Sequence, residues 1–309
     1  MLSFFKKKAT KGGLTSVVFT AEGVSIAHMQ STPTGSKLKF CEHYQTSSPL
    51  TEISRFSETV AINNMAGSNT VVVLPDDAYQ ILLIEKPDLP DEEVHDALRW
   101  RVKDLVSFDI EQAFIDYIEL PEDAYRNRSQ MIYVVVAQNK PVEKYISWCQ
   151  EIGLHPSVVD VPELALLNLT EELADSEAGL AVFAVGEKSS SINLLSDESL
   201  YFTRQLSFSQ ESSPEQASSA VLELQRSMDY YESQIGKPPC VRLMVIPLMM
   251  EDEPLISELR YNLPLDIHSL NLENLVSTDI ALSAELQKKA TVAVASALRS
   301  IGELGESSA

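Results

Sequence analysis

Short apolar runs broken by turn residues open the chain and predict strands. Leu14–Thr20 and Val24–Gln30 flank a glycine-containing turn, which is typical of a β-hairpin. Lys37–Gln45 alternates between apolar and polar residues and is expected to form a third strand. A helix over Thr51–Asn63 and a buried strand at Thr70–Pro75 are expected to follow.

The middle of the chain alternates between the periods of strand and helix. In Asp91–Val106 apolar residues recur every three or four positions, which predicts an amphipathic helix with an acidic first turn at the positive end of its dipole. The residues expected on its apolar face are Val94, Leu98, Val102 and Leu105. The other predicted elements are the strands Ile81–Lys86, Ala113–Leu120, Met131–Ala137 and Val158–Val161 and a helix from Pro141 to Gly153. Together they give the order β-α-β-β-α-β of a small ferredoxin-like subdomain.

The second half repeats this mixture of strands and helices. Its longest predicted helix has one apolar stripe with spacings of three and four residues. The residues of that stripe are Ala217, Val221, Leu224, Met228, Tyr231 and Ile235. The predicted strands are Leu180–Val185, Ser190–Leu195, Leu200–Leu206 and Val241–Ile246, and the later helices are Glu253–Asn262 and Ala284–Ile301.

Three strands with helices, occurring twice, predict an α/β protein of two related lobes with a cleft between them. The expected parts are a flexible arm at 1–13, a first lobe at 14–76, 156–176 and 284–301, an inserted subdomain at 77–155, a second lobe at 177–283 and a loose tail at 302–309. The acidic segment Glu171–Glu177 is expected to be a linker.

Charge and composition narrow the function classes. The 309 residues carry a formal net charge of −21, which disfavours binding to the phosphate backbone of nucleic acids. The three cysteines show no CxxC spacing and are expected to be small buried residues in a reducing compartment. No apolar run reaches the length of a membrane span and no signal peptide is recognised, so we expect a cytoplasmic location.

One basic cluster lies at the N-terminus. It consists of Phe4, Phe5, Lys6, Lys7 and Lys8. Aromatic and lysine side chains suit a weak contact with an anionic membrane surface, where each lysine contributes about 1 kcal/mol. The alternative, which the small number of lysines favours, is a solvated tail.

The sequence lacks the motifs of common catalytic sites. It has 11 glycines, about half the average frequency, and contains neither GxGxxG nor GxxxxGK[ST], so no phosphate-binding loop is predicted. HExxH and GxSxG are also missing, and the five histidines share no ligand spacing. We therefore predict no catalytic residue and no metal site.

Five blocks of sequence, in the right order, resemble the PilM family of type IV pilus assembly proteins. The most extended is DLPDEEVHDALRWRVKDLVSFDIEQAFIDYIEL, at Asp88–Leu120. The other blocks are Gly153–Leu169, Ser199–Phe208, Leu222–Gln234 and Ala290–Ser300. The short length and the FFKKK start most resemble the MshI branch of the family, from the mannose-sensitive haemagglutinin (MSHA) pilus system.

This resemblance implies an actin/FtsA-like two-lobed fold with an inserted small subdomain. The second lobe is expected to be shortened, because only one helix is predicted between Gln210 and Val241. The resemblance also implies a cytoplasmic protein, peripheral to the inner membrane, that binds the cytoplasmic N-terminal tail of a PilN-like membrane protein, which would be MshJ-like in the MSHA system. Other platform proteins or the motor ATPase are further partners that it suggests.

The nucleotide-binding pattern of the family is degenerate in this sequence. Members that bind ATP carry an Asp in the first strand, a later Asp-x-Gly turn and a glycine-rich adenosine loop. By resemblance, the corresponding positions are Val18, Ala184, Gly186, Val245, Ile246 and Pro247. The carboxylates that would hold Mg²⁺ are missing, and Pro247 has no N–H to donate. We therefore expect no cofactor, ATP included.

Three functions remain open. The first is a non-catalytic scaffold that anchors a partner's tail through Arg99, Trp100 and Arg101, because an exposed Trp flanked by Arg is a typical peptide anchor. The alternative for Trp100 is packing at a joint between subdomains. The second function is an actin-like ATPase or nucleotide switch, for which the fold alone argues. The third is the cytoplasmic part of a GspL-like type II secretion protein, which ranks last because no membrane span follows the domain.

Overall fold

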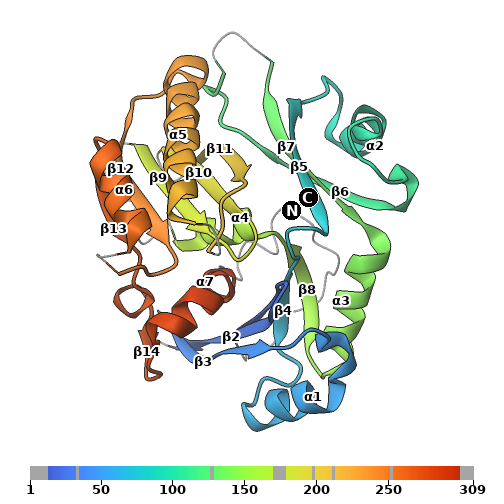
Figure 1. The fold of residues 1–309 in the computed structure, drawn as a ribbon. Helices are drawn as coiled ribbons and strands as arrows, with labels where there is room; N and C mark the ends of the chain where they lie inside the picture. The colour runs from blue at the N-terminus through green and yellow to red at the C-terminus, as the bar shows by residue number, and fades with distance from the viewer. Residues whose placement is uncertain are drawn as a thin grey trace.

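The computed structural model describes residues 13–32, 35–125, 129–169, 179–196, 199–210, 213–250 and 253–299. The predicted arm up to Gly12 with its Phe4–Lys8 cluster, the linker Glu171–Glu177 and the tail 302–309 lie outside these residues. Figure 1 shows two sheet-containing lobes, with the inserted subdomain beside the second lobe. No helix in the described ranges is long and apolar enough to cross a membrane.

The first lobe is built on a six-stranded sheet in the order β14-β3-β2-β1-β4-β8. Its strands are β1 (Leu14–Phe19), β2 (Gly23–Thr32), β3 (Gly35–Gln45), β4 (Asn69–Val73), β8 (His155–Asp160) and β14 (Ser277–Thr278). The predicted hairpin forms, with β1 antiparallel to β2 and parallel to β4. A Cβ on Gly23 would lie 2.0 Å from the Tyr44 carbonyl oxygen, so glycine is needed where β2 approaches β3.

Successive residues of β1 serve two different cores, because side chains of a strand alternate between the faces of a sheet. Val17 packs with α1 (Ile53–Ile62) and α3 (Asn139–Glu151), through Phe56 and Trp148. Val18 packs on the opposite face with α7 (Ala284–Ala297), which also covers β2 and β3. The first-lobe sheet is thus covered by helices on both faces, as expected for an α/β lobe.

The second lobe contains a five-stranded sheet in the order β11-β10-β9-β12-β13. Its strands are β9 (Gly179–Val185), β10 (Ser190–Ser196), β11 (Ser199–Leu206), β12 (Cys240–Ile246) and β13 (Asp266–Ser269). The helices α5 (Pro214–Tyr230) and α6 (Pro254–Asn262) lie together on one face of this sheet (Figure 1). The predicted apolar stripe of α5, continued by a π-helical turn at Tyr231–Ile235, is buried throughout.

The inserted subdomain has a three-stranded antiparallel sheet in the order β5-β7-β6. Its strands are β5 (Tyr79–Glu85), β6 (Ala113–Glu119) and β7 (Met131–Gln138), and α2 (Asp91–Val102) covers one face through Val94, Leu98 and Val102. The fourth predicted face residue, Leu105, lies beyond the helix and is 54% exposed, so this part of the prediction was wrong.

The expected βαββαβ ferredoxin-like order was wrong in its last element, whereas α3 follows β7 as predicted and packs Val142 against it. β8 does not join the inserted sheet but pairs in parallel with β4 of the first lobe. Trp148 and Cys149 of α3 and Ile152 directly after it pack into the first-lobe core. The burial of β8 explains its place in the first lobe. Every residue of β8 after His155 is buried, which fits a strand of a parallel pair that is covered by helices on both faces.

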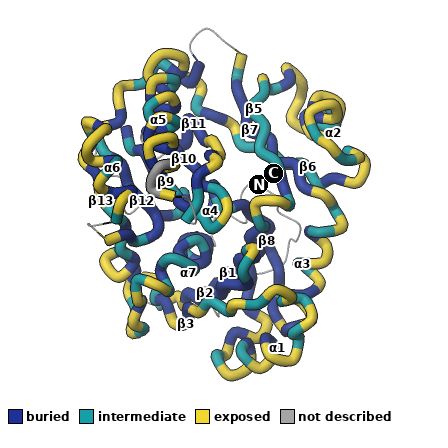
Figure 2. The backbone as a smooth tube through the Cα atoms, viewed as in Figure 1, coloured by how far each residue is buried: buried dark blue, intermediate teal, exposed yellow. Residues whose placement is uncertain are grey.

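The other face of the inserted sheet packs against the second lobe. Met131 and Tyr133 of β7 share one hydrophobic core with Phe202 of β11 and Tyr231 after α5. Figure 2 shows this joint buried, whereas α1 and α2 expose their outer sides. The insert therefore packs against both lobes, since Val135 and Ala137 on the same face of β7 also share a hydrophobic core with Val159 near the end of β8.

Candidate functional site

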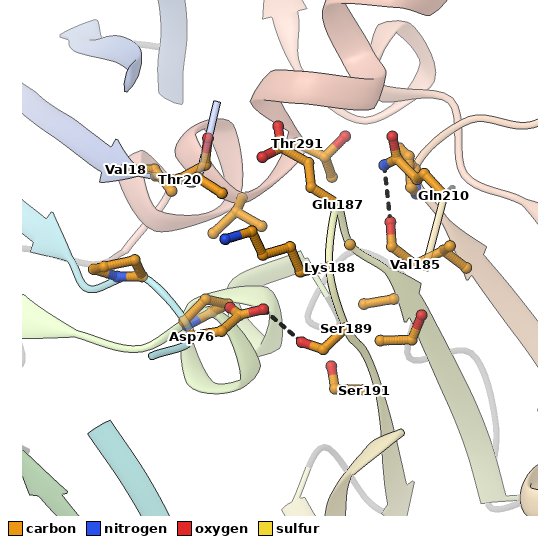
Figure 3. A pocket seen from close by; sticks show the side chains of 18 of the residues that line it. Val18, Thr20, Asp76, Val185, Glu187, Lys188, Ser189, Ser191, Gln210 and Thr291 are labelled. Atoms are coloured by element: carbon orange, nitrogen blue, oxygen red, sulfur yellow. Dashed lines mark hydrogen bonds between the residues drawn. The ribbon is translucent and has the colours of Figure 1, made fainter. Parts of the chain in front are cut away.

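A cavity of about 280 Å³ lies between the two lobes. Its walls are the β1–β2 turn and α7 from the first lobe and the β9–β10 turn and the end of β12 from the second (Figure 3). A second cavity of about 350 Å³ lies near the start of α5 and α6. The two share lining residues, among them Gln210, Lys288 and Lys289, so they lie next to each other.

The structure brings most of the degenerate nucleotide positions to this cleft. Its wall includes Val18, Ala184, Gly186, Ile246 and Pro247. The exception is Val245, which is fully buried in the second-lobe core. Successive side chains of a strand point to opposite faces of the sheet, so Val245 lies on the opposite face from Ile246. Gly186 is required by its turn, since an added Cβ would lie 2.4 Å from the Ser189 carbonyl oxygen. The Ile246–Pro247 peptide bond is cis.

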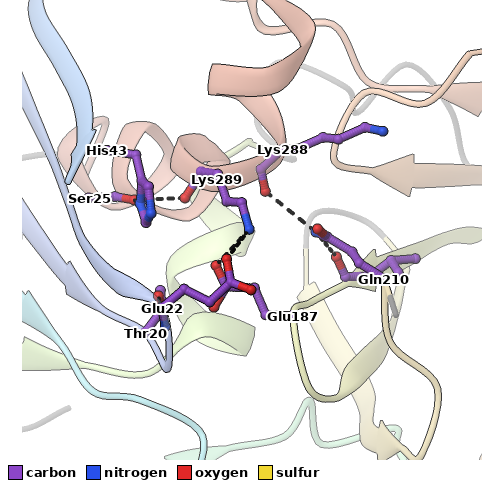
Figure 4. Close-up of polar contacts among 9 residues, drawn as sticks. Thr20, Glu22, Ser25, His43, Glu187, Gln210, Lys288 and Lys289 are labelled. Atoms are coloured by element: carbon purple, nitrogen blue, oxygen red, sulfur yellow. Dashed lines mark hydrogen bonds and ion pairs between the residues drawn. The ribbon is translucent and has the colours of Figure 1, made fainter. Parts of the chain in front are cut away.

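Charged side chains fill part of the cleft. The Lys289 ammonium donates to Glu22 Oε2 and lies 3.3 Å from Glu187 Oε1 (Figure 4). Burial alone would lower the pKa of Lys289, but the hydrogen bonds and negative charges of Glu22 and Glu187 outweigh it, and the net effect raises this pKa. The lysine is therefore an ammonium at neutral pH.

Further polar contacts cross the cleft beside this lysine. Ser189 Oγ donates to Asp76 Oδ2 at 2.5 Å (Figure 3). Gln210 Nε2 donates to the Val185 carbonyl at 3.0 Å and more weakly to the Lys288 carbonyl at 3.5 Å. These contacts occupy hydroxyl, amide and ammonium groups that could otherwise donate hydrogen bonds to a phosphate group.

Glu163 lies at the point where the three parts of the protein meet. Its carboxylate, from α4 (Pro162–Ala165), accepts from the Tyr79 hydroxyl of the insert at 2.6 Å and from Gln205 Nε2 of the second lobe at 2.8 Å. Its carbonyl oxygen accepts from Asn193 Nδ2 at 2.8 Å. Burial raises the pKa of this carboxyl, although the two hydrogen bonds to the carboxylate oppose the shift.

The three residues predicted as peptide anchors on α2 have different environments. Arg99 is half-buried and donates to the Ile110 carbonyl at 2.6 Å, so its role is structural. Trp100 is 70% exposed, and the Lys103 ammonium lies 4.9 Å from its ring centroid. Arg101 is exposed and donates to the Glu85 carbonyl at 2.9 Å. Trp100 therefore does not pack at a joint and is available on the surface.

Several important residues escaped the sequence analysis. Glu22, Glu187 and Lys289 are far apart in sequence and carry no motif, and Glu163 looks like an ordinary helix-start carboxylate. A usable signal was present only at Gly186-Glu187, where a charged residue follows a glycine at a strand end. Within the described ranges, no three His, Cys, Asp or Glu residues are grouped so that they could hold a metal ion.

The family model described as type IV pilus assembly protein PilM matches residues 61–220, a little over half of the chain. The chain belongs to the PilM family. The resemblance in the five sequence blocks is thereby confirmed at the level of the family. No curated protein matches this PilM-family chain in sequence.

Solved structures show that this PilM-family protein has an actin-like fold. A PilM–PilN type IV pilus biogenesis complex contains a chain that is 19% identical, with 94% of this chain and 98% of that chain covered and a TM-score of 0.75. A Bacteroides thetaiotaomicron protein of unknown function with an actin-like ATPase fold is 12% identical, with 89% and 96% covered and a TM-score of 0.53. The cytoplasmic domain of EpsL, an inner-membrane component of the Vibrio cholerae type II secretion system, is 9% identical, with 91% and 94% covered and a TM-score of 0.51.

Proposed function

We propose that this PilM-family protein is a non-catalytic scaffold of the type IV pilus assembly platform. In this proposal it is cytoplasmic, peripheral to the inner membrane, and binds the cytoplasmic N-terminal tail of a PilN-like membrane protein. The observation that carries the proposal is the likeness, over 94% of the chain, to a protein solved in a PilM–PilN complex. The finer assignment to the MshI branch, with an MshJ-like partner, rests on the length and the FFKKK start.

Trp100 on α2 is the residue that we propose as the anchor for the tail. A large aromatic ring kept 70% exposed is the kind of side chain that contributes most binding energy when a partner buries it. Tyr261 of α6 is even more exposed, at 88%, but it lies outside the segment matched by the family model, whereas α2 lies within it. Arg101 adds an exposed cation beside Trp100 and suits a tail that carries carboxylates.

Isothermal titration of the full chain with a synthetic peptide of the partner's tail tests this function. We expect one-to-one binding in the micromolar range. Trp100→Ala is expected to weaken binding at least about thirtyfold, because hot-spot aromatics cost about 2 kcal/mol or more when truncated. The matched control is Tyr261→Ala, which removes a still more exposed aromatic from the second lobe. No heat and no complex at high micromolar peptide would reject the scaffold function, and equal binding by Trp100→Ala would reject the anchor.

We propose in addition that the cleft does not bind ATP. The wall positions Val18 and Ala184 have no carboxylate to hold Mg²⁺ through water, the Asp76 and Asp77 carboxylates at the cleft would repel phosphates, and the Lys289 ammonium is already paired with Glu22 and Glu187. The remaining cavity volume is the observation that favours the alternative, a nucleotide switch.

Equilibrium binding of labelled ATP with Mg²⁺ separates these alternatives. The scaffold proposal expects no saturable binding up to about 1 mM nucleotide. A dissociation constant of about 1 mM corresponds to a binding free energy of about −4 kcal/mol, so any affinity would be weaker than this. Saturation at low micromolar ATP would establish a nucleotide site instead. The likeness to EpsL concerns the fold and adds no argument for a secretion function.

A further inference from the structure

Two turns from different lobes face each other across the cleft, and one lysine joins them. The β1–β2 turn of the first lobe contributes Glu22, and the β9–β10 turn of the second lobe contributes Glu187. Lys289 of α7 forms ion pairs with both carboxylates (Figure 4). The exposed fractions of the three side chains are 34%, 13% and 18%, so these ion pairs are largely shielded from water.

The position of Lys289 is fixed by the helix that carries it. The following residues Ala290 and Thr291 are buried in the first lobe, and the Lys289 carbonyl accepts a hydrogen bond from the buried Ser25 hydroxyl at 2.7 Å. The backbone of Lys289 is therefore anchored in the first lobe, although α7 also shares a hydrophobic core with Val182 and Ile246 of the second lobe. Its bond to Glu187 is a direct link from the first lobe to the second.

The charges make this link stronger than an ordinary surface pair. Without the ammonium, the carboxylates of Glu22 and Glu187 would face each other in a partly buried place, where repulsion between like charges is weakly screened. With Lys289 between them, each carboxylate has a counter-charge within hydrogen-bonding or ion-pairing distance. The lysine thus converts a repulsive contact between the lobes into an attractive one.

Neighbouring contacts support the same alignment of the lobes. Ser189, in the same turn as Glu187, bonds to Asp76 between β4 and β5. Lys288, next to Lys289 on α7, lies 3.3 Å from Glu253 at the start of α6. Both contacts join the second lobe to the rest of the molecule on either side of Lys289.

We propose that Lys289 is a built-in clasp that holds the two lobes in one arrangement independently of any ligand. In a cleft that works by ligand binding, the ligand bridges the walls and selects the closed arrangement. Here a side chain of the protein bridges them without a ligand. The inference concerns the relation between the lobes and does not depend on the partner proposed above.

Distance measurement by electron spin resonance tests the clasp. Spin labels at Ile62→Cys on α1 and Tyr261→Cys on α6 report the separation of the lobes, since both positions are highly exposed and the native cysteines are buried. The parent protein is expected to give one narrow distance distribution. Lys289→Met, which keeps the length of the side chain and removes its charge, is expected to broaden it or add a second, longer distance.

The matched control is Lys37→Met, which breaks a 2.6 Å ion pair with Asp279 inside the first lobe. An unchanged distribution in Lys289→Met, or the same change in Lys37→Met, would overturn the proposal. Should Lys289→Met fail to fold, Glu187→Gln removes only the second-lobe arm of the clasp and must broaden the distribution in the same way. Hydrogen exchange gives a second readout, in which amides of both turns are expected to exchange at least about tenfold faster in the clasp variants.

Discussion

Tyr133 and Thr203 join the inserted subdomain to the second lobe through a single hydroxyl group. The Tyr133 hydroxyl accepts a hydrogen bond from the Thr203 backbone N–H at 2.9 Å and donates one to the Thr203 carbonyl at 3.3 Å. Tyr133 is on β7 and Thr203 is on β11, the edge strand of the second-lobe sheet. The Tyr133 hydroxyl thus occupies the Thr203 N–H and carbonyl groups, with which another strand could otherwise form hydrogen bonds.

Removing this hydroxyl is expected to destabilise the protein. Tyr133→Phe keeps the ring but leaves the buried N–H of Thr203 without its partner, which costs about 1–3 kcal/mol. Urea unfolding followed by circular dichroism measures the loss. Tyr261→Phe, in an 88% exposed position, serves as the control and should stay within about 0.5 kcal/mol. Equal stability of the two variants would contradict the importance of the contact.

A second link of the insert to the second lobe is the ion pair of Asp123 with Lys237, at 2.6 Å. The Lys237 ammonium also lies 4.3 Å from the Tyr201 ring centroid, and the Tyr201 hydroxyl donates to Asp123 at 2.7 Å. Asp123 is largely exposed, so a double-mutant cycle of Asp123→Asn and Lys237→Met should give a coupling energy of only about 0.5–1 kcal/mol. A coupling indistinguishable from zero would show that the pair does not hold the joint.

Glu163 is expected to make stability depend on pH. Because burial raises its folded pKa, the folded state binds this proton more tightly than the unfolded state, whose pKa is about 4.3. The contribution of Glu163 to the stability of the folded protein is therefore fully present below the unfolded pKa. It is lost as the pH rises through the folded pKa. The stability of the parent protein relative to Glu163→Gln should fall as the pH rises from about 4.5 towards neutral. Unfolding curves across this range measure it, with Glu93→Gln as the exposed-carboxylate control; parallel pH profiles for parent and Glu163→Gln would refute the prediction.

The three cysteines are expected to be unreactive in the folded protein. Cys41, Cys149 and Cys240 are buried and free. Burial raises the pKa of Cys41 and Cys240 to about 12 and that of Cys149 still higher, so little thiolate is present at neutral pH. A disulfide exchange reagent such as DTNB should react with them only at the rate at which the protein unfolds. Rapid labelling in native buffer would contradict this.

The two arginines beside Trp100 should differ in their effect on stability. Arg99→Ala removes the donor to the Ile110 carbonyl between α2 and β6 and is expected to cost about 1–2 kcal/mol. Arg101→Ala changes an exposed side chain and should cost no more than about 0.5 kcal/mol. Thermal unfolding of the two variants measures which of them loses more stability. A larger loss of stability in Arg101→Ala than in Arg99→Ala would contradict the structural role of Arg99.

Local periodicity carried most of the fold prediction. The stripe of α5 and the alternation in β3 were recognised, because burial on one face leaves a period in the sequence. The strands β1 and β2 are buried on both faces over most of their length and were recognised as short apolar runs. Two elements were missed, β13 with four residues and β14 with two, since neither is long enough to show a period. β8 was recognised as a strand, but its partner β4 lies 86 to 87 residues earlier, and a local sequence pattern does not identify the strand with which another strand pairs.

The site was predictable only where it depends on strand ends. The resemblance placed Val18, Ala184 and Gly186, and these do line the cleft. Lys289 and its two glutamates come from three distant segments, and each alone looks like a solvated charge. Their role arises only when the fold brings the β1–β2 and β9–β10 turns to the same helix.

The two-residue strand β14 pairs with β3 at Lys37 and Leu38 and so occupies part of the outer edge of the first-lobe sheet. Lys37 and Lys39 of β3 also form ion pairs with Asp279, just after β14. A free edge of this kind is a template for strands of other molecules. The chain thereby shields part of this edge from pairing with strands of other molecules.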